Sequence, residues 1–360
     1  MQKSRRTARL TRIAVAVAAM STVAVLAGCS SAPADGAAGT PGASGKKFVI
    51  GFEQPLGGQA WREMGLASLQ ALANSPEYKD KVELKIVRTN DNDAAQQNAA
   101  MQNLIADGVD LILFDPASSS GANAAIAQAS AQGIPVIANG GPYDGSDVYV
   151  VSTDWAKAGT TGADWLVKNL GANKNVAVLE GLAGVPLNEG SMPGVIDDLK
   201  AGGANVVAQD TNGWNEATAQ QAMSNILQSN PDVGGVYSFL TGGQGVPEAF
   251  KAAGIPFVPV VGGSGYNGEA CELVKYGPEG LKGDMVFGQP AIYAKGLEQA
   301  VKLLEGGTID KTQLFPPLEI NNDNAATFCL PDKPANFQLG YDFPGLNIQL
   351  SDVLTYYSGN

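Results

Sequence analysis

The sequence of 360 residues contains no histidine, only three cysteines, and fewer basic than acidic residues. The absence of histidine excludes a Ser–His–Asp or Cys–His catalytic group and a histidine-ligated zinc site. Its 23 Lys and Arg residues against 35 Asp and Glu residues give a net charge of −12. This disfavours nucleic acid as a partner, because phosphate contacts need clustered basic side chains. The hydrophobic fraction of 44% against 16% charged residues predicts a folded chain, whose length suits about two domains.

Residues 1–28 have the order of an export signal. Five basic residues come first, and an apolar run from Ile13 to Ala27 follows them. The run is shorter than the roughly 20 residues that a membrane-spanning helix needs. It ends in Leu26-Ala27-Gly28-Cys29, which resembles a bacterial lipobox. That resemblance implies cleavage before Cys29 and a lipid on its side chain. An ordinary signal peptide, with Cys29 there by chance, is the alternative.

The segment that follows the signal is small and polar. Residues 30–45 carry no large apolar side chain, so they cannot bury enough surface to offset the entropy of ordering. We therefore expect residues 29–45 to form a flexible tether. Removal of residues 1–28 takes away five basic residues and no acidic one. It leaves 18 basic and 35 acidic residues, a net charge of −17.

The two remaining cysteines lie far apart in the sequence. Cys271 and Cys329 are left as a pair in an exported, oxidising setting once Cys29 carries a lipid. A disulfide between them would close a loop of about 59 residues and contribute roughly 4 kcal/mol of stability on the chain-entropy account. Two separate buried thiols are the alternative.

From Lys47 onward, short β-branched runs alternate with longer Ala-rich stretches. Most of the runs are continuously apolar, which is typical of parallel strands buried on both faces. Residues 82–87 alternate instead and are expected at a sheet edge. The pattern predicts an α/β chain of βαβ crossovers divided between two lobes. The expected strands are 48–52, 82–87, 111–114, 135–138, 148–151, 176–179, 206–208, 233–237, 257–261 and 285–287. The expected helices are 59–74, 93–106, 122–132, 156–170, 196–201, 216–228, 246–253 and 291–305.

Ligands of doubly wound sheets bind beyond the carboxyl ends of the strands. In this sequence those positions hold mainly uncharged hydrogen-bonding residues and aromatic residues, without a cluster of Lys or Arg. Anionic ligands are therefore disfavoured. A neutral, polyhydroxylated ligand fits better, because its hydroxyl groups need donors and acceptors and its ring faces need an aromatic surface.

Five segments in order resemble the ribose/galactose-type periplasmic binding proteins, which are the substrate-binding components of ABC importers. They are residues 97–116, 132–137, 152–154, 181–184 and 231–237, within a likeness that covers about 46–320. The resemblance implies two Rossmann-like lobes with parallel sheets, joined by a three-crossover hinge that closes on a ligand. The first lobe would comprise 46–152 plus 289–316, and the second 155–287 plus 317–360 with a C-terminal extension. Asp154 would lie at the hinge, and the extension would be stapled by its disulfide within the second lobe.

The resemblance also implies two aromatic residues that stack on a sugar. Trp61 matches the one early in the first helix, and Trp214 matches the one before a helix of the second lobe. Trp155 and Trp165 are expected to be packing residues. The charged residues that the family usually has at its ligand site are largely missing. Gly140-Gly141 occupies the positions of an Asp-Arg pair, and Glu189 is the nearest match to the position of an Arg. The remaining candidate ligand residues are Glu53, Gln54, Asn139, Asn188, Glu189, Thr241, Ser264, Tyr266, Asn267 and Gln289.

These observations predict an exported, lipid-anchored, monomeric binding subunit that takes a neutral sugar or polyol and delivers it to a membrane permease with its ATPase. A cationic or amine-bearing ligand is the alternative, because Glu53 and Glu189 could both face the cleft. A sensor that presents its ligand to a signalling receptor is a second alternative. Enzymatic activity, a cofactor and nucleic-acid binding are not expected. No metal site is expected either, because residues 90–93 and 321–324 lack the glycine and distal Glu of an EF-hand.

Overall fold

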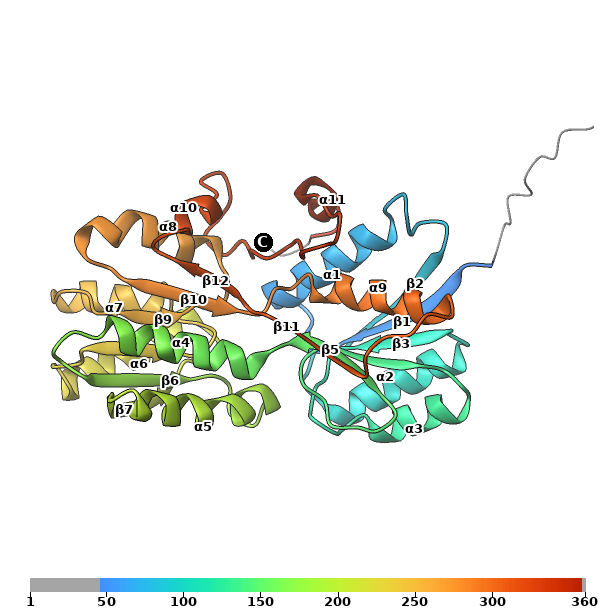
Figure 1. The fold of residues 1–360 in the computed structure, drawn as a ribbon, viewed down its shortest axis with the longest axis horizontal. Coiled ribbons are helices and arrows are strands. Elements are labelled where there is room, and N and C mark those ends of the chain that lie inside the picture. Colours follow the sequence, from blue (N-terminus) through green and yellow to red (C-terminus); the bar gives the residue numbers. More distant parts are fainter. Residues whose placement is uncertain (1–45, 358–360) are drawn as a thin grey trace, which may run out of the picture. The chain divides into compact units, whose positions relative to one another are not determined.

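The computed structural model describes residues 46–357 of the chain (Figure 1). The predicted signal peptide, tether and lipidation site Cys29 lie outside these residues. Within the described range, no helix combines the length and apolar character needed to span a membrane.

The first lobe is built on a six-stranded sheet of order β11-β5-β4-β3-β1-β2, in which all neighbours are parallel. The edge position of β2 confirms what its alternating pattern predicts. Helices α1 and α9 cover one face of the sheet, and α2 and α3 cover the other (Figure 1). The strands are β1 (Phe48–Gln54), β2 (Val82–Arg88), β3 (Leu111–Phe114), β4 (Val136–Gly140), β5 (Tyr149–Thr153) and β11 (Thr312–Phe315). The helices are α1 (Ala60–Ala73), α2 (Ala94–Ala106), α3 (Asn123–Ala131) and α9 (Ile292–Leu304).

The second lobe repeats this design on a six-stranded sheet of order β12-β10-β9-β8-β6-β7, in which only β12 is antiparallel to its neighbour. The strands are β6 (Asn175–Glu180), β7 (Asn205–Thr211), β8 (Gly235–Ser238), β9 (Val260–Gly262), β10 (Gly283–Phe287) and β12 (Leu318–Asn321). The helices are α4 (Trp155–Asn169), α5 (Pro186–Ala201), α6 (Glu216–Ser229), α7 (Gly245–Ala253), α8 (Asn267–Tyr276), the 3₁₀ turn η1 (Gly277–Glu279) and α10 (Ala325–Phe328). Two α/β lobes with mainly parallel sheets confirm the predicted fold class.

Helix α5 begins ten residues before the predicted start at residue 196. Proline occupies its first turn and Pro193 lies inside it, and a proline in a helix interior removes a hydrogen bond and disfavours the helix. Burial of Met192, Val195 and Leu199 in the core of the second lobe compensates for that loss. Helices α8 and α10 and strands β11 and β12 were not predicted.

The chain passes from one sheet to the other after β5, after β10 and between β11 and β12. It then crosses again in residues 329–357, which we call the C-terminal strap. The strap starts at Cys329, which forms a disulfide with Cys271 of α8 in the second lobe. It ends in α11 (Leu350–Leu354), which packs on α1 of the first lobe.

The end of the strap therefore differs from the predicted assignment of residues 317–360 to the second lobe. The carbonyl oxygen of Tyr341 accepts a hydrogen bond of 2.8 Å from Ser68 of α1. Phe343, Ile348 and Val353 are all buried in the hydrophobic core that α1 and α9 help to form. The apolar side chains of the strap thus cover surface that the helices of the first lobe would otherwise expose to water.

Candidate functional site

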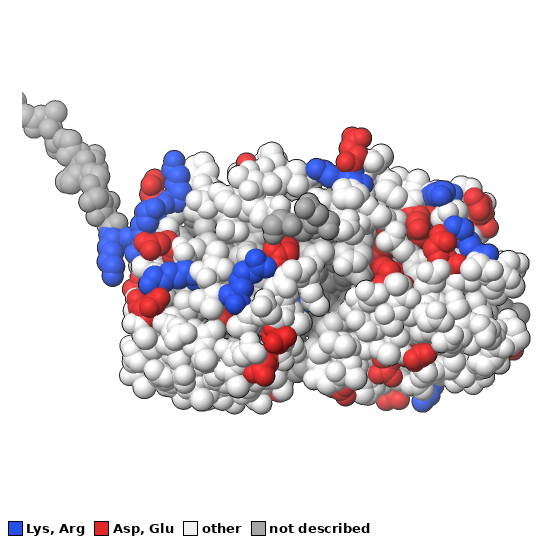
Figure 2. Space-filling view, turned by 180° about the vertical axis from the view of Figure 1, so that it is seen from behind, with Lys and Arg blue, Asp and Glu red and all other residues white. Residues whose placement is uncertain are grey.

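A pocket of about 390 Å³ lies at the carboxyl ends of the strands and takes residues from both lobes and from the C-terminal strap. This is where doubly wound sheets bind their ligands. Figure 2 shows the molecular surface hollowed between the two lobes, with largely uncharged walls. Arg62 and Asp115 are the charged residues among those that line the pocket.

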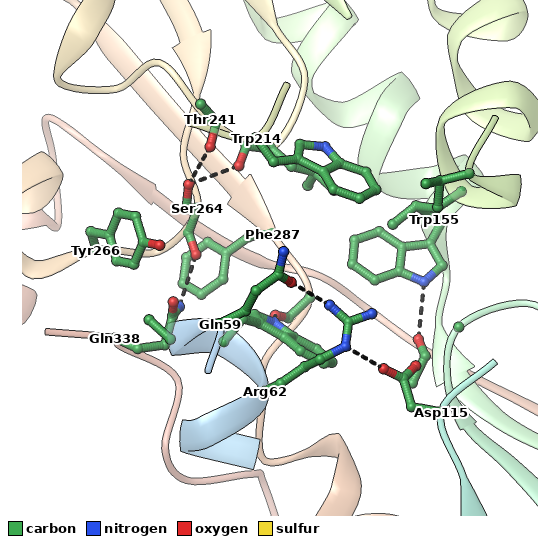
Figure 3. A pocket seen from close by; sticks show the side chains of 18 of the residues that line it. Gln59, Arg62, Asp115, Trp155, Trp214, Thr241, Ser264, Tyr266, Phe287 and Gln338 are labelled. Carbon is green, nitrogen blue, oxygen red and sulfur yellow. Dashed lines mark hydrogen bonds and ion pairs between the residues drawn. The ribbon is translucent and has the colours of Figure 1, made fainter. Parts of the chain in front are cut away.

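Five aromatic residues line the pocket: Trp61, Trp155, Trp214, Tyr266 and Phe287. Trp61, in the first turn of α1, donates from Nε1 to the carbonyl oxygen of Gly288 at 2.6 Å. Trp155 donates from Nε1 to the carbonyl oxygen of Gly140 at 3.2 Å. Trp155 opens α4 and lines the pocket, so it does more than pack a helix as the sequence suggested. Figure 3 shows Trp155 and Trp214 across the pocket from Gln59 and Arg62.

Two residues of the pocket wall hold a backbone conformation that L-residues rarely adopt. Trp214 has φ of 56° and Leu240 has φ of 57°, a left-handed conformation that costs about 1–2 kcal/mol for a residue with a side chain. Asn212 fixes the turn, because its Oδ1 accepts from the Trp214 amide at 2.8 Å and its Nδ2 donates to the Phe239 carbonyl at 3.0 Å. Strain held by such surroundings is characteristic of functional sites.

The two charged residues of the pocket neutralise each other. Arg62 Nε donates to Asp115 Oδ2 at 2.8 Å, and Nη1 donates to the Gln59 side chain. The Tyr293 hydroxyl donates to the same Asp115 oxygen at 2.8 Å, and burial raises the pKa of Tyr293 well above its usual value. The pair has no net charge, but it still offers hydrogen-bonding groups to a ligand.

Hydroxyl groups from two loops of the second lobe meet at the opposite side of the pocket. Thr241 and Ser264 form a hydrogen bond to each other, and Ser264 Oγ also donates to the Leu240 carbonyl at 2.9 Å (Figure 3). Below them, the Glu269 carboxyl group accepts from the backbone amides of Ser264 at 3.1 Å and Tyr266 at 2.8 Å. Burial, followed by the neighbouring carboxyl group of Glu216, raises the pKa of Glu269 well above its usual value.

Glu53 and Gln54, expected as ligand residues, lie beneath the pocket and do not line it. The Glu53 carboxyl group accepts from Gln97 Nε2, which also donates to the Asp115 carbonyl at 2.8 Å. Burial raises the pKa of Glu53 to about 8, and the charge of Asp115 adds to the rise. Glu53 therefore supports the ends of β1 and β3 from below.

Five further candidates bind the protein's own backbone outside the pocket. Three of them donate to backbone carbonyl groups: Asn139 to Ile292 at 2.9 Å, Asn267 to Leu330 at 2.9 Å and Gln289 to Asp342 at 3.3 Å. The other two accept from backbone amides: Asn188 from Gly181 at 2.7 Å and Glu189 from Gly184 at 2.8 Å. Glu189 and Asn188 lie at a separate shallow surface pocket beside α5. Asp154 caps α4, since its Oδ1 accepts from the Lys157 amide at 2.9 Å.

The pocket thus brings together Trp61, Trp214, Thr241, Ser264 and Tyr266 from the predicted set. The sequence reasoning missed Gln59, Arg62, Asp115, Trp155, Phe287, Asn336 and Gln338. Asp115 and Phe287 lie at the carboxyl ends of β3 and β10, so the strand-end rule could have found both. Within residues 46–357, no group of three or more acidic or cysteine side chains is placed to hold a metal ion.

Comparison with known proteins agrees with this architecture. Residues 50–308 match the family described as "Periplasmic binding protein domain". The chain belongs to this family. The resemblance to ribose-type periplasmic binding proteins of ABC importers is thereby confirmed, and it is consistent with a protein that is not an enzyme and that faces the periplasm.

Relatives of this periplasmic binding protein carry names of sugar and polyol binders. The ribose import binding protein of Bacillus subtilis (strain 168) is 27% identical over 312 residues, covering 85% of this chain and 98% of that protein. The xylitol-binding protein of Mycolicibacterium smegmatis is 28% identical over 239 residues, covering 65% and 67%. An ABC transporter solute-binding protein of Thermobispora bispora has the same fold, with a TM-score of 0.71 at 24% identity, covering 81% and 90%.

Proposed function

We propose that this protein is the solute-binding subunit of an ABC importer and holds a neutral sugar or polyol between its two lobes. One observation carries the proposal: an aromatic-walled pocket in which Arg62 and Asp115, the charged lining residues within 46–357, pair with each other. The aromatic rings suit the apolar faces of a sugar ring. Gln59, Thr241 and Ser264 supply the polar contacts that fix orientation.

The balance of charge supports a neutral ligand. A charged solute would enter with no free counter-charge, because the Asp115 carboxylate already accepts from Arg62 and Tyr293. Burying an uncompensated charge is strongly unfavourable. The alternative of a cationic ligand rested on Glu53 and Glu189, and neither residue lines the pocket. The names of the relatives, which bind ribose and xylitol, agree with the neutral class.

Titration calorimetry on residues 46–360 tests the proposal. The panel comprises pentoses, hexoses, furanose-forming sugars and linear polyols, with primary and quaternary amines as the competing class. Trp214→Leu should weaken the best sugar or polyol about tenfold or more, because it removes a stacking surface. Trp165→Leu is the matched control, since Trp165 lies outside the pocket. No heat with any sugar or polyol, or tighter binding of an amine, would refute the proposal.

We further propose that the protein is exported as a monomer and anchored by a lipid on Cys29, so that it delivers its ligand to a permease and ATPase from the membrane surface. The lipobox-like Leu26–Cys29 and the polar segment after it support this. Mass spectrometry of the protein from membranes should find an acylated Cys29 at the amino end. Cys29→Ser should shift the protein into the soluble fraction, and an unchanged distribution would contradict the anchor.

A further inference from the structure

The C-terminal strap is a built part of the pocket. Its first half is fixed to the second lobe by the Cys271–Cys329 disulfide and by the side chain of Asn267, whose Nδ2 donates to the Leu330 carbonyl at 2.9 Å. Backbone hydrogen bonds follow, from Asn267 to the Phe337 carbonyl at 2.8 Å and from Leu339 to the Gly265 carbonyl at 2.7 Å. These contacts hold the residue between them, Gln338, against the loop of Ser264 and Tyr266.

Gln338 lines the pocket, and the nitrogen of its side-chain amide is hydrogen-bonded whereas the oxygen is not. Its Nε2 donates to the Ser264 carbonyl at 2.8 Å and to the Gly265 carbonyl at 3.2 Å (Figure 3). The residue is fully buried, and its Oε1 has no hydrogen-bond partner among the described residues. A buried acceptor without a partner is unfavourable, and such groups in native proteins call for an explanation.

A second unpaired polar atom belongs to the same pocket wall. Trp214 Nε1, a donor, is buried without a partner in the described part of the chain. Trp214 Nε1 packs against Gly181, so it faces the protein and not the ligand space. This leaves Gln338 Oε1 as the candidate acceptor for a ligand, and a hydroxyl group can donate to it.

We propose that Gln338 is a ligand-contacting residue, with Oε1 accepting a hydrogen bond from one ligand hydroxyl. The disulfide-anchored strap is then a third wall of the binding site, in addition to the two lobes. This inference rests on the proposed function for the identity of the solute. It differs from that function in assigning a ligand contact to a segment beyond the matched family region, which ends at residue 308.

The decisive experiment compares Gln338→Met with Gln349→Met by titration calorimetry. Both substitutions replace a glutamine of the strap with a side chain of similar shape, but Gln349 is exposed and away from the pocket. The probe is the sugar or polyol of the panel that binds most tightly, together with its monodeoxy analogues. Gln338→Met should weaken the probe about tenfold, and Gln349→Met should leave it unchanged.

The deoxy analogues separate a ligand contact from a structural role. One analogue should bind wild type about tenfold more weakly than the parent and yet bind Gln338→Met as well as the parent does. A structural role would instead weaken all ligands by a similar factor. Equal affinity of Gln338→Met and wild type, or a uniform loss across the analogues, would overturn the inference. Thermal unfolding of each variant verifies that the fold is retained.

Crystals soaked in glycerol provide an arm that does not depend on the sugar. A glycerol hydroxyl within hydrogen-bonding distance of Gln338 Oε1 supports the inference, even if no sugar of the panel binds and the proposed function fails. Glycerol elsewhere in the pocket, or no glycerol in it, counts against Gln338. The failure of the assigned contact and the failure of the proposed function are thus distinguishable.

Discussion

Replacing Glu53 by Gln should change how the stability of the protein depends on pH. The Glu53 carboxyl group is fully buried, and burial raises its pKa from 4.5 to about 8. The folded protein therefore binds a proton that the unfolded chain releases between those two pH values, so wild-type stability falls as pH rises through this window. Above about pH 8 the carboxyl group is ionised in both the folded and the unfolded state. The free energy of unfolding of the wild type is then roughly 5 kcal/mol lower than it is below pH 4.5.

Glu53→Gln keeps the shape of the side chain and its partners, Gln97 and Thr89, but has no proton to lose. The free energies of unfolding of variant and wild type should be similar at pH 4. As the pH rises from 4.5 to about 8, the free energy of unfolding of the variant should exceed that of the wild type by about 1.4 kcal/mol more for each pH unit. The excess should reach roughly 5 kcal/mol at pH 9. Urea denaturation of residues 46–360, followed by circular dichroism and tryptophan fluorescence, measures this difference.

Glu83→Gln is the matched control, because Glu83 is exposed on β2 of the same sheet. Its difference from wild type should stay constant within about 0.5 kcal/mol across the range. If the Glu53→Gln difference also stays constant from pH 4 to 9, the carboxyl group is ionised in the folded protein, and the reasoning from burial is wrong. An infrared titration of the carboxyl band in both proteins would report directly at which pH Glu53 is ionised in the folded state.

Three further changes have expected outcomes in urea denaturation. The pair Cys271→Ser and Cys329→Ser should lower the free energy of unfolding by about 4 kcal/mol, because their disulfide spans 58 positions, and a reducing agent should then have no further effect. Asp154→Ala should cost about 1 kcal/mol by removing the cap of α4, whereas Asp80→Ala, at an exposed position without a helix to cap, should be neutral. Arg62→Met should cost about 3 kcal/mol, because the Asp115 carboxylate stays buried without its cation; a loss below about 1 kcal/mol would contradict the pairing.

Hydrophobic pattern predicted the fold well because strand and helix periods are local properties. Strand 111–114 has the predicted bounds, and β2 stands at the predicted edge. The short elements were missed for a local reason too. Strand β12 is only four residues long, and α8 begins with Asn267-Gly268, which resembles a turn more than a helix start.

The site was harder to predict than the fold, because a residue at the end of a strand can point into the cleft or away from it. Glu53 and Asn139 both occupy strand ends, yet Glu53 points toward Gln97 and Asn139 toward α9. Successive side chains of a strand face opposite sides, so a shift of one residue decides the outcome. Asn336 and Gln338 reach the pocket only through the path of the strap, which no local pattern in the sequence reveals.

The path of the strap also bears on the order in which the protein can fold. Helix α1, near residue 60, is covered by α11, near residue 350. The first lobe therefore cannot bury its full apolar surface until nearly the whole described chain has emerged, and contacts of such long separation form slowly. The last part of the described chain to be synthesised is thus needed before the first lobe can complete its core.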